Sequence, residues 1–135
     1  PNAAFLFIGP SDMARKNGLA FESYPLLEEL TLQLRNELLS RGVAFWDLYD
    51  VMGGSGSMVE WVDAQPALAV RDYIHFTPKG ASKVGRSLVR ALNVLEDQYN
   101  TVIAIEHAEA QRLADSAALF KQMNQGTGAA TETVE

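Results

Sequence analysis

The amino-acid sequence predicts an α/β fold that is built on a parallel sheet. An apolar run at residues 3–8 stops at a Gly-Pro turn, an amphipathic helical pattern covers residues 25–40, and a second apolar run follows at residues 43–49. A strand, a helix and a strand with short joints form a βαβ unit, in which the strands are parallel and the crossover is right-handed.

Length, charge and cysteine content exclude several classes of protein. The chain has 135 residues, a formal net charge of -6 and 47% hydrophobic residues, which suits one modest domain and argues against wholesale disorder. The acidic balance argues against nucleic acid as the main partner. Because there is no Cys, disulfides, thiolate zinc sites and cysteine nucleophiles are excluded, and no apolar run approaches a membrane span.

The first half of the chain contains one predicted strand and one predicted helix. We expect residues 3–8 to form a strand that is buried on both faces, and Asn17-Gly18 marks a loop. Ser23 is expected to cap a helix over residues 25–40, with Pro25 in its first turn and Arg41-Gly42 at its end. Its apolar face carries leucines at helical spacing: Leu27, Leu30, Leu34 and Leu38.

The second half begins with a predicted buried strand at residues 43–49, and a flexible Gly/Ser loop follows at residues 53–57. We then expect a short helix at residues 58–63 and an irregular segment at residues 65–73. Thr77-Pro78 predicts a helix start. The apolar face of that helix carries Ala81, Val84, Leu88, Leu92 and Leu95. Residues 101–124 predict an additional helix with a weaker apolar stripe, and residues 125–135 predict a disordered tail.

One candidate for chemistry is His75, which follows Asp72 by three residues. In a loop or single turn, this spacing lets the carboxylate reach Nδ1 of the imidazole. It would then fix the tautomer, stabilise the imidazolium and leave Nε2 available as a general base. The alternative is that both residues simply lie in a surface loop before a helix.

The wider segment Asp72-Tyr-Ile-His75-Phe-Thr-Pro-Lys-Gly80 resembles the last block of the SGNH (GDSL) hydrolases, which are serine esterases and lipases. The resemblance implies a three-layer α/β/α, flavodoxin-like parallel sheet, and it implies catalytic roles for His75 and Asp72 in a Ser-His-Asp triad. It extends over about residues 3–95. The Gly-Gly loop with Met58 and Trp61 is similar to carbohydrate and peptidoglycan O-acetylesterases of this superfamily.

The sequence lacks the Gly-Asp-Ser nucleophile block and the blocks that supply the oxyanion hole in that family, all of which precede the strand that residues 3–8 resemble. The chain also enters an apolar stretch almost directly after Pro1. The resemblance therefore implies that residues 1–100 are the C-terminal half of an SGNH domain. The expected partners are the N-terminal half, as a second polypeptide or a swapped copy, and an acylated carbohydrate substrate. Family members of this kind favour a periplasmic or extracellular location.

Two serines of the chain are alternative nucleophiles. Ser55 lies in Gly-Gly-Ser-Gly-Ser, which departs from G-x-S-x-G at Ser57, and the stretch is also explained as a flexible loop. Ser11 follows a predicted strand, but Pro10 precedes it, and it is equally explained as a turn residue.

The remaining candidates have structural explanations as well. His107 is interpreted as a solvated helix residue, whereas Asp47 and Asp50 either cap a turn or bind a ligand at the edge of the sheet. Met58 and Trp61 either line an acyl or sugar pocket or pack in the core. No metal-ligand spacing occurs, and no cofactor is expected. The alternative function is a non-catalytic SGNH-like module that binds carbohydrate or a protein, with residues 101–123 as its docking helix.

Overall fold

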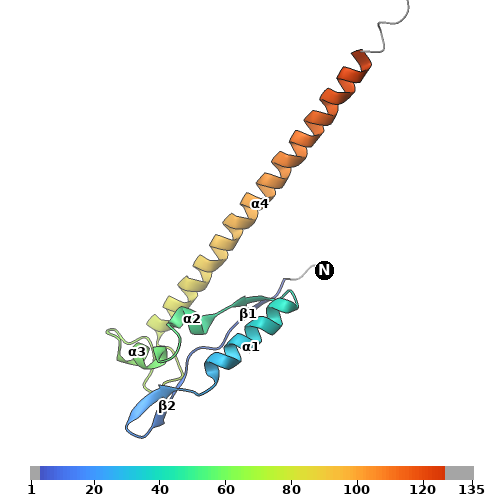
Figure 1. Cartoon of the computed structure of the whole chain (residues 1–135). Coiled ribbons are helices and arrows are strands. Elements are labelled where there is room, and N and C mark those ends of the chain that lie inside the picture. Colours follow the sequence, from blue (N-terminus) through green and yellow to red (C-terminus); the bar gives the residue numbers. More distant parts are fainter. Residues whose placement is uncertain (1–3, 127–135) are drawn as a thin grey trace, which may run out of the picture. The chain divides into compact units, whose positions relative to one another are not determined.

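The computed structural model describes residues 4–126, which form a mixed α/β structure with a small parallel sheet and a small antiparallel sheet (Figure 1). The chain divides into two compact units, Pro1–Ala91 and Leu92–Glu135. The first unit contains every strand of the described residues, together with helices α1 to α3 and the start of α4.

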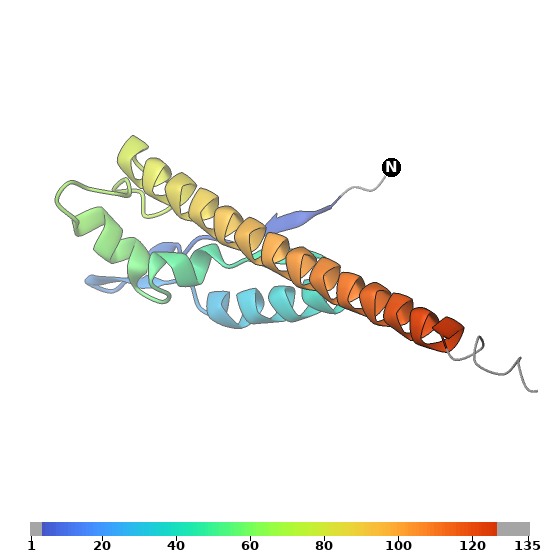
Figure 2. The same cartoon turned by 90° about the horizontal axis from the view of Figure 1, so that it is seen from above.

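The predicted βαβ unit is confirmed. Strand β1 (Leu6–Ile8) pairs in parallel with β4 (Ala44–Trp46), with Phe7 opposite Phe45. Helix α1 (Leu27–Ser40) connects them and packs beside β4 (Figure 2). The prediction that the first strand is buried on both faces is wrong, since Phe7 and Ile8 are 41% and 45% exposed. Within the described residues β1 has a single neighbouring strand, so one edge and much of its apolar surface stay uncovered.

The start of α1 differs from the prediction. Ser23 does not cap the helix, because it ends strand β3 and its hydroxyl donates a hydrogen bond to Asp12. The N-cap position is Leu26, which has a left-handed backbone (φ 64) and forms no side-chain cap. The end of α1 is as predicted, with Arg41 at the C-cap and Gly42 at φ 73, a conformation that favours glycine.

Residues 14–23 form a hairpin that the sequence did not predict. Strand β2 (Ala14–Asn17) pairs antiparallel with β3 (Ala20–Ser23), and the turn contains Gly18 at φ 61. Asn17-Gly18 is thus a hairpin turn rather than an open loop. These strands lack the alternation of apolar and polar residues that predicts a strand. Nearly all of their side chains are exposed, so no apolar face has to be buried.

The second predicted strand is shorter than expected. It ends at Trp46, and Asp47 accepts a hydrogen bond from the backbone N–H of Asp50, which caps helix α2 (Leu48–Met52). The apolar residues after Asp47 therefore belong to a helix. The short helix predicted next is confirmed as α3 (Ser57–Asp63).

The core of the first unit lies between α2, α3 and the segment before α4. Its buried members are Ala14, Leu48, Met52, Met58, Trp61, Val62 and Ala69. Met58 is fully buried, and the indole N–H of Trp61 donates to the carbonyl of Met52 at 3.1 Å. These interactions settle the role of both residues as core packing.

Helix α4 (Pro78–Gly126) begins as predicted, since Thr77 Oγ1 accepts the N–H of Gly80 at 3.2 Å. Residues 101–124 lie within this one helix, and the backbone shows no break before Thr101. The second unit contains the part of α4 from Leu92 onward, and nearly all of its described side chains are exposed. No helix within residues 4–126 combines the length and the apolar character that crossing a membrane requires. The predicted tail lies almost wholly outside the described residues.

Candidate functional site

The segment that carries Asp72 and His75 is a closed loop just before α4. Its ends are joined by an isolated bridge between Ala69 and Phe76, and the N–H of Val70 donates to the carbonyl of His75 at 2.8 Å. Tyr73, which lies at the tip, has φ 60 and donates its N–H to the carbonyl of Val70. A residue other than glycine at positive φ is uncommon, and here backbone hydrogen bonds on either side hold it in place.

The loop brings Asp72 and His75 into direct contact. His75 Nδ1 lies 2.7 Å from Asp72 Oδ2. The other carboxylate oxygen, Oδ1, accepts the backbone N–H groups of Ile74 at 2.9 Å and His75 at 3.0 Å. The carboxylate is therefore anchored to the backbone of its own turn while it orients the imidazole. A neutral imidazole that donates from Nδ1 carries its lone pair on Nε2, the atom that a general base uses.

These hydrogen bonds also set the charge of Asp72. The backbone N–H of His75, its imidazole and the N–H of Ile74 together lower the pKa of Asp72 to about 2. Asp72 is therefore a carboxylate throughout the pH range in which a histidine acts as a base. The side chains of Asp72 and His75 are 44% and 76% exposed, so the pair is open to a reacting group from outside the unit.

Contacts with two other elements fix the loop in the first unit. The N–H of Ala14 donates to the carbonyl of Tyr73 at 3.0 Å, and the ring of Tyr73 stacks on Phe21 of the hairpin. Phe76 packs on Trp61 of α3, with 5.5 Å between the ring centroids. The hairpin that sequence reasoning missed thus contributes to holding the catalytic candidates.

None of the serines in the described residues forms a hydrogen bond with His75. Ser55 interacts with Tyr49, whose pKa is raised mainly by burial. Ser11 is half-buried, and Ser57 is buried with its hydroxyl directed to Asp12 at 3.4 Å. Neither candidate nucleophile of the sequence is therefore joined to the His75–Asp72 pair.

Asp12 is an important residue that the sequence concealed. It is fully buried, and its Oδ2 accepts the N–H of Met58 at 2.8 Å and the hydroxyl of Ser23 at 2.9 Å. Ser23 in turn accepts the N–H of Gly56 at 2.7 Å. Within the described residues Oδ1 is buried without a hydrogen-bond partner. Asp12 joins the turn after β1, the end of β3 and the start of α3, and the only signal in the sequence was its place after an apolar run.

The other polar candidates do not join this site. Asp47 caps α2 and Asp50 is exposed within that helix, in agreement with their structural interpretation. His107 is exposed on α4, in the second unit. Across residues 4–126 no three His, Asp or Glu side chains come together in a way that could hold a metal ion.

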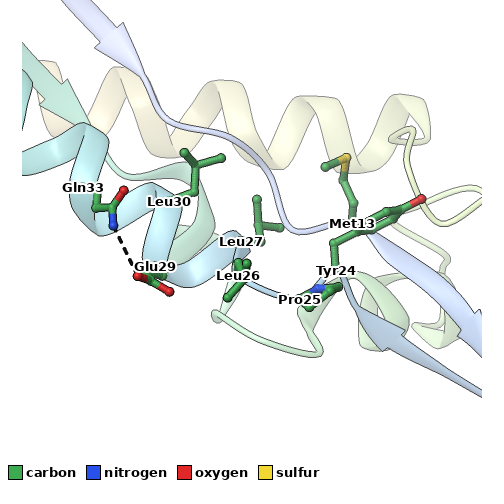
Figure 3. Close-up of a pocket in the computed structure, with 8 residues that line it drawn as sticks. All are labelled: Met13, Tyr24, Pro25, Leu26, Leu27, Glu29, Leu30 and Gln33. Atoms are coloured by element: carbon green, nitrogen blue, oxygen red, sulfur yellow. Dashed lines mark hydrogen bonds between the residues drawn. The ribbon is translucent and has the colours of Figure 1, made fainter.

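A separate apolar hollow of about 430 Å³ lies at the start of α1 (Figure 3). Met13 and Tyr24 line it from the hairpin side, and Leu27 and Leu30 line it from the helix. Its rim is unusually apolar for a surface, since Leu26 is 73% exposed and Leu30 is 49% exposed. Neither Asp72 nor His75 contributes to it, so this hollow is distinct from the candidate catalytic pair.

Comparison with known proteins gives one informative match. Over 69% of its length the chain matches a solved structure of a peptidoglycan O-acetylesterase, with a TM-score of 0.61 and 26% sequence identity. The chain spans only about a quarter (26%) of that protein's length. No family model matches the chain, and neither does any curated protein. The chain therefore resembles part of an α/β esterase.

Proposed function

We propose that the chain is part of a serine ester hydrolase, an acetylesterase that acts on carbohydrate or peptidoglycan. The observation that carries the proposal is the 2.7 Å contact between His75 Nδ1 and Asp72 Oδ2 at an exposed loop. The partial structural match to a peptidoglycan O-acetylesterase, at 26% identity, supports the same reaction class. The substrate of that protein is the reason for proposing an acetylated glycan.

In this mechanism His75 is the general base and then the general acid. Its Nε2 takes the proton from a serine hydroxyl while the serine oxygen attacks the ester carbonyl, and it then protonates the departing sugar hydroxyl. A water molecule, deprotonated in the same way, attacks the acyl-enzyme and releases acetate and the free serine. Asp72 orients the imidazole and stabilises its protonated form.

The nucleophilic serine and the oxyanion donors come, in this proposal, from an N-terminal half of the same domain, as a second polypeptide or a swapped copy. Two observations support it. In the described residues no serine hydrogen-bonds His75. In addition, β1 has a free edge among the described strands, and apolar side chains in and just before it are exposed, with Phe5 at 72% and Ile8 at 45%. A base without a nucleophile leaves this chain inactive alone.

The test of the catalytic pair is ester turnover by the assembled protein that carries the serine. Replacing His75 by Ala should lower turnover by 10²–10⁴-fold while leaving substrate binding nearly unchanged, because that is the usual contribution of a positioned general acid–base. His107→Ala is the matched control, since it removes an exposed histidine of the second unit and should leave turnover unchanged. Activity of His75→Ala within tenfold of the parent would contradict the base role.

The source of the serine is tested separately on this polypeptide alone, with a serine-directed fluorophosphonate probe. No labelling is expected. Labelling at Ser55 or Ser11 would overturn the proposal that the nucleophile lies outside the chain.

A second candidate function, a non-catalytic module that docks a partner, is favoured by the apolar side chains that α4 exposes. Ile105, Leu113 and Phe120 are 54%, 73% and 65% exposed. If the assembled protein binds acetylated glycan but shows no ester turnover, this function replaces the first.

A further inference from the structure

A second feature of the first unit is a shallow groove of about 430 Å³ along the start of α4. Pro66 and Leu68 form one wall, and the first turns of the helix form the other with Pro78, Lys79, Lys83 and Arg86. Neither His75 nor Asp72 lines this groove. All of them lie in the unit Pro1–Ala91, as does the His75 loop.

The charge of this groove is opposite to that of the chain. The chain has a formal net charge of -6, yet no Asp or Glu is among the described residues that line the groove. Lys79, Lys83 and Arg86 follow one another at helical spacings of four and three, which places them on one side of α4. None of these three cations forms an ion pair with a residue in the range 4–126. Like charges at such spacings repel one another, so an anion bound between them is favourable.

The walls of the groove are held rigidly. The N–H of Thr77 donates to the carbonyl of Leu68 at 3.0 Å, and its hydroxyl donates to the carbonyl of Ala67 at 2.8 Å. Gly80 lies so close to this segment that an added Cβ would be 1.9 Å from the oxygen of Leu68. Because both walls are anchored to each other, the backbone of the groove needs little further ordering when a ligand enters.

One of the cations is also positioned by a core aromatic ring. The ammonium of Lys83 lies 4.7 Å above the ring of Trp61, and this ring also packs on Phe76 and donates its N–H to the carbonyl of Met52. This cation–π contact restricts an otherwise flexible side chain. It links the groove to Phe76, the residue that follows His75.

We propose that this groove binds the anionic groups, carboxylate or phosphate, of the glycan that carries the ester. The identification of a glycan rests on the proposed function, whereas the preference for anions rests on Lys79, Lys83 and Arg86 alone. A nucleic acid fits less well, because no aromatic side chain is among the lining residues to stack on a base.

Binding of anionic ligands by the full chain tests this proposal without any measurement of ester hydrolysis. The probes are hexagalacturonate as the carboxylate source, polyphosphate as the phosphate source, neutral chitohexaose, and a six-nucleotide oligothymidylate. We expect hexagalacturonate or polyphosphate to bind at least tenfold more tightly than chitohexaose and oligothymidylate at low salt. The stronger of the two anions identifies the group that is recognised, and its affinity should fall as salt is added.

Matched variants locate the binding. The triple variant Lys79→Gln, Lys83→Gln, Arg86→Gln should bind the preferred anionic probe at least tenfold more weakly than the parent. Arg86→Gln alone should weaken that binding by about threefold. The control triple variant Lys16→Gln, Arg90→Gln, Lys121→Gln removes the same charge from exposed positions outside the groove and should change affinity less than twofold. Circular dichroism checks that each variant is folded.

The proposal is overturned if the two triple variants lose the same affinity for the preferred anionic probe. It is also overturned if chitohexaose binds as tightly as hexagalacturonate and polyphosphate, or if oligothymidylate binds more tightly than both. Each of these outcomes leaves the proposed ester hydrolysis untouched, since that is tested by His75→Ala in the assembled protein. Conversely, an inactive assembled protein whose groove still selects an anion would contradict only the proposed catalysis.

Discussion

Two aspartates of the first unit show how surroundings determine what a carboxylate does. Asp72 accepts two backbone N–H groups and faces His75 at the surface, so it remains ionised, with a pKa lowered to about 2, and it orients an imidazole. Asp12 accepts the N–H of Met58 and the hydroxyl of Ser23 in the interior, where no solvent reaches it. The first carboxylate serves the proposed chemistry, and the second joins three segments of the fold.

Asp12→Ala should lower the free energy of unfolding by about 1–3 kcal/mol. The substitution leaves the N–H of Met58 and the hydroxyl of Ser23 buried without their acceptor, and a buried donor that loses its partner costs about this much. Asp50→Ala is the control, because Asp50 is exposed, and it should change stability by no more than about 0.5 kcal/mol. Chemical denaturation measures the free energy of unfolding of both variants. An equal decrease in the two would show that Asp12 has no special role in stability.

At the scale of elements, the junction between residues 66–69 and the start of α4 positions both proposed sites. Thr77 caps the helix and also holds the preceding segment through Leu68 and Ala67. The bridge between Ala69 and Phe76 then closes the loop that presents His75. A displacement of this junction would move the imidazole and the basic groove together.

Gly80→Ala should destabilise the first unit by about 1–3 kcal/mol. The new methyl group would overlap the carbonyl oxygen of Leu68, so the junction must separate, which is the usual cost of overpacking. Gly85→Ala, one and a half turns along the same helix, meets nothing within 4 Å and should instead stabilise by about 0.5–1 kcal/mol. Denaturant midpoints show whether each substitution raises or lowers the free energy of unfolding. An increase for Gly80→Ala would refute the close contact with Leu68.

At the scale of the whole molecule, the first unit exposes apolar side chains at β1 that a larger sheet with covering helices would bury. Phe5, Leu6, Phe7 and Ile8 are all at least 39% exposed, and β1 pairs with β4 alone among the described strands. An exposed apolar strand with a free edge is a site for pairing with another chain.

We therefore expect concentration-dependent self-association of this chain when it is studied without the proposed N-terminal half. Ile8→Lys places a charge on β1 and should reduce association strongly, because a charged side chain opposes burial and edge pairing. Leu19→Lys is the control, since Leu19 is fully exposed in the hairpin turn, outside both sheets. Sedimentation velocity measures the mass, and a well-behaved monomer of the unaltered chain at all concentrations would contradict the need for a second half.

Sequence patterns predicted the elements whose signals are local. The leucine spacing and Arg41-Gly42 located α1 to within two residues, Thr77-Pro78 located the start of α4, and the βαβ pattern predicted parallel strands. They failed at three places, for different reasons. The hairpin has no apolar alternation, and Asp47 caps a helix within what the pattern predicted as one apolar strand. Ser23 bonds to Asp12, eleven residues away, rather than capping α1.

The sequence by itself predicted that Asp72 can reach His75, because a three-residue spacing in a tight turn allows the carboxylate to approach Nδ1, and the structure shows this contact at 2.7 Å. Only the tertiary structure decided that Asp12 is buried, that Ser55 and Ser11 form no hydrogen bond with His75, and that Lys79, Lys83 and Arg86 face a groove. These properties depend on which distant segments lie side by side. Short-range spacing carries no information about such contacts, since they arise only when the hairpin, α3 and the start of α4 pack against one another.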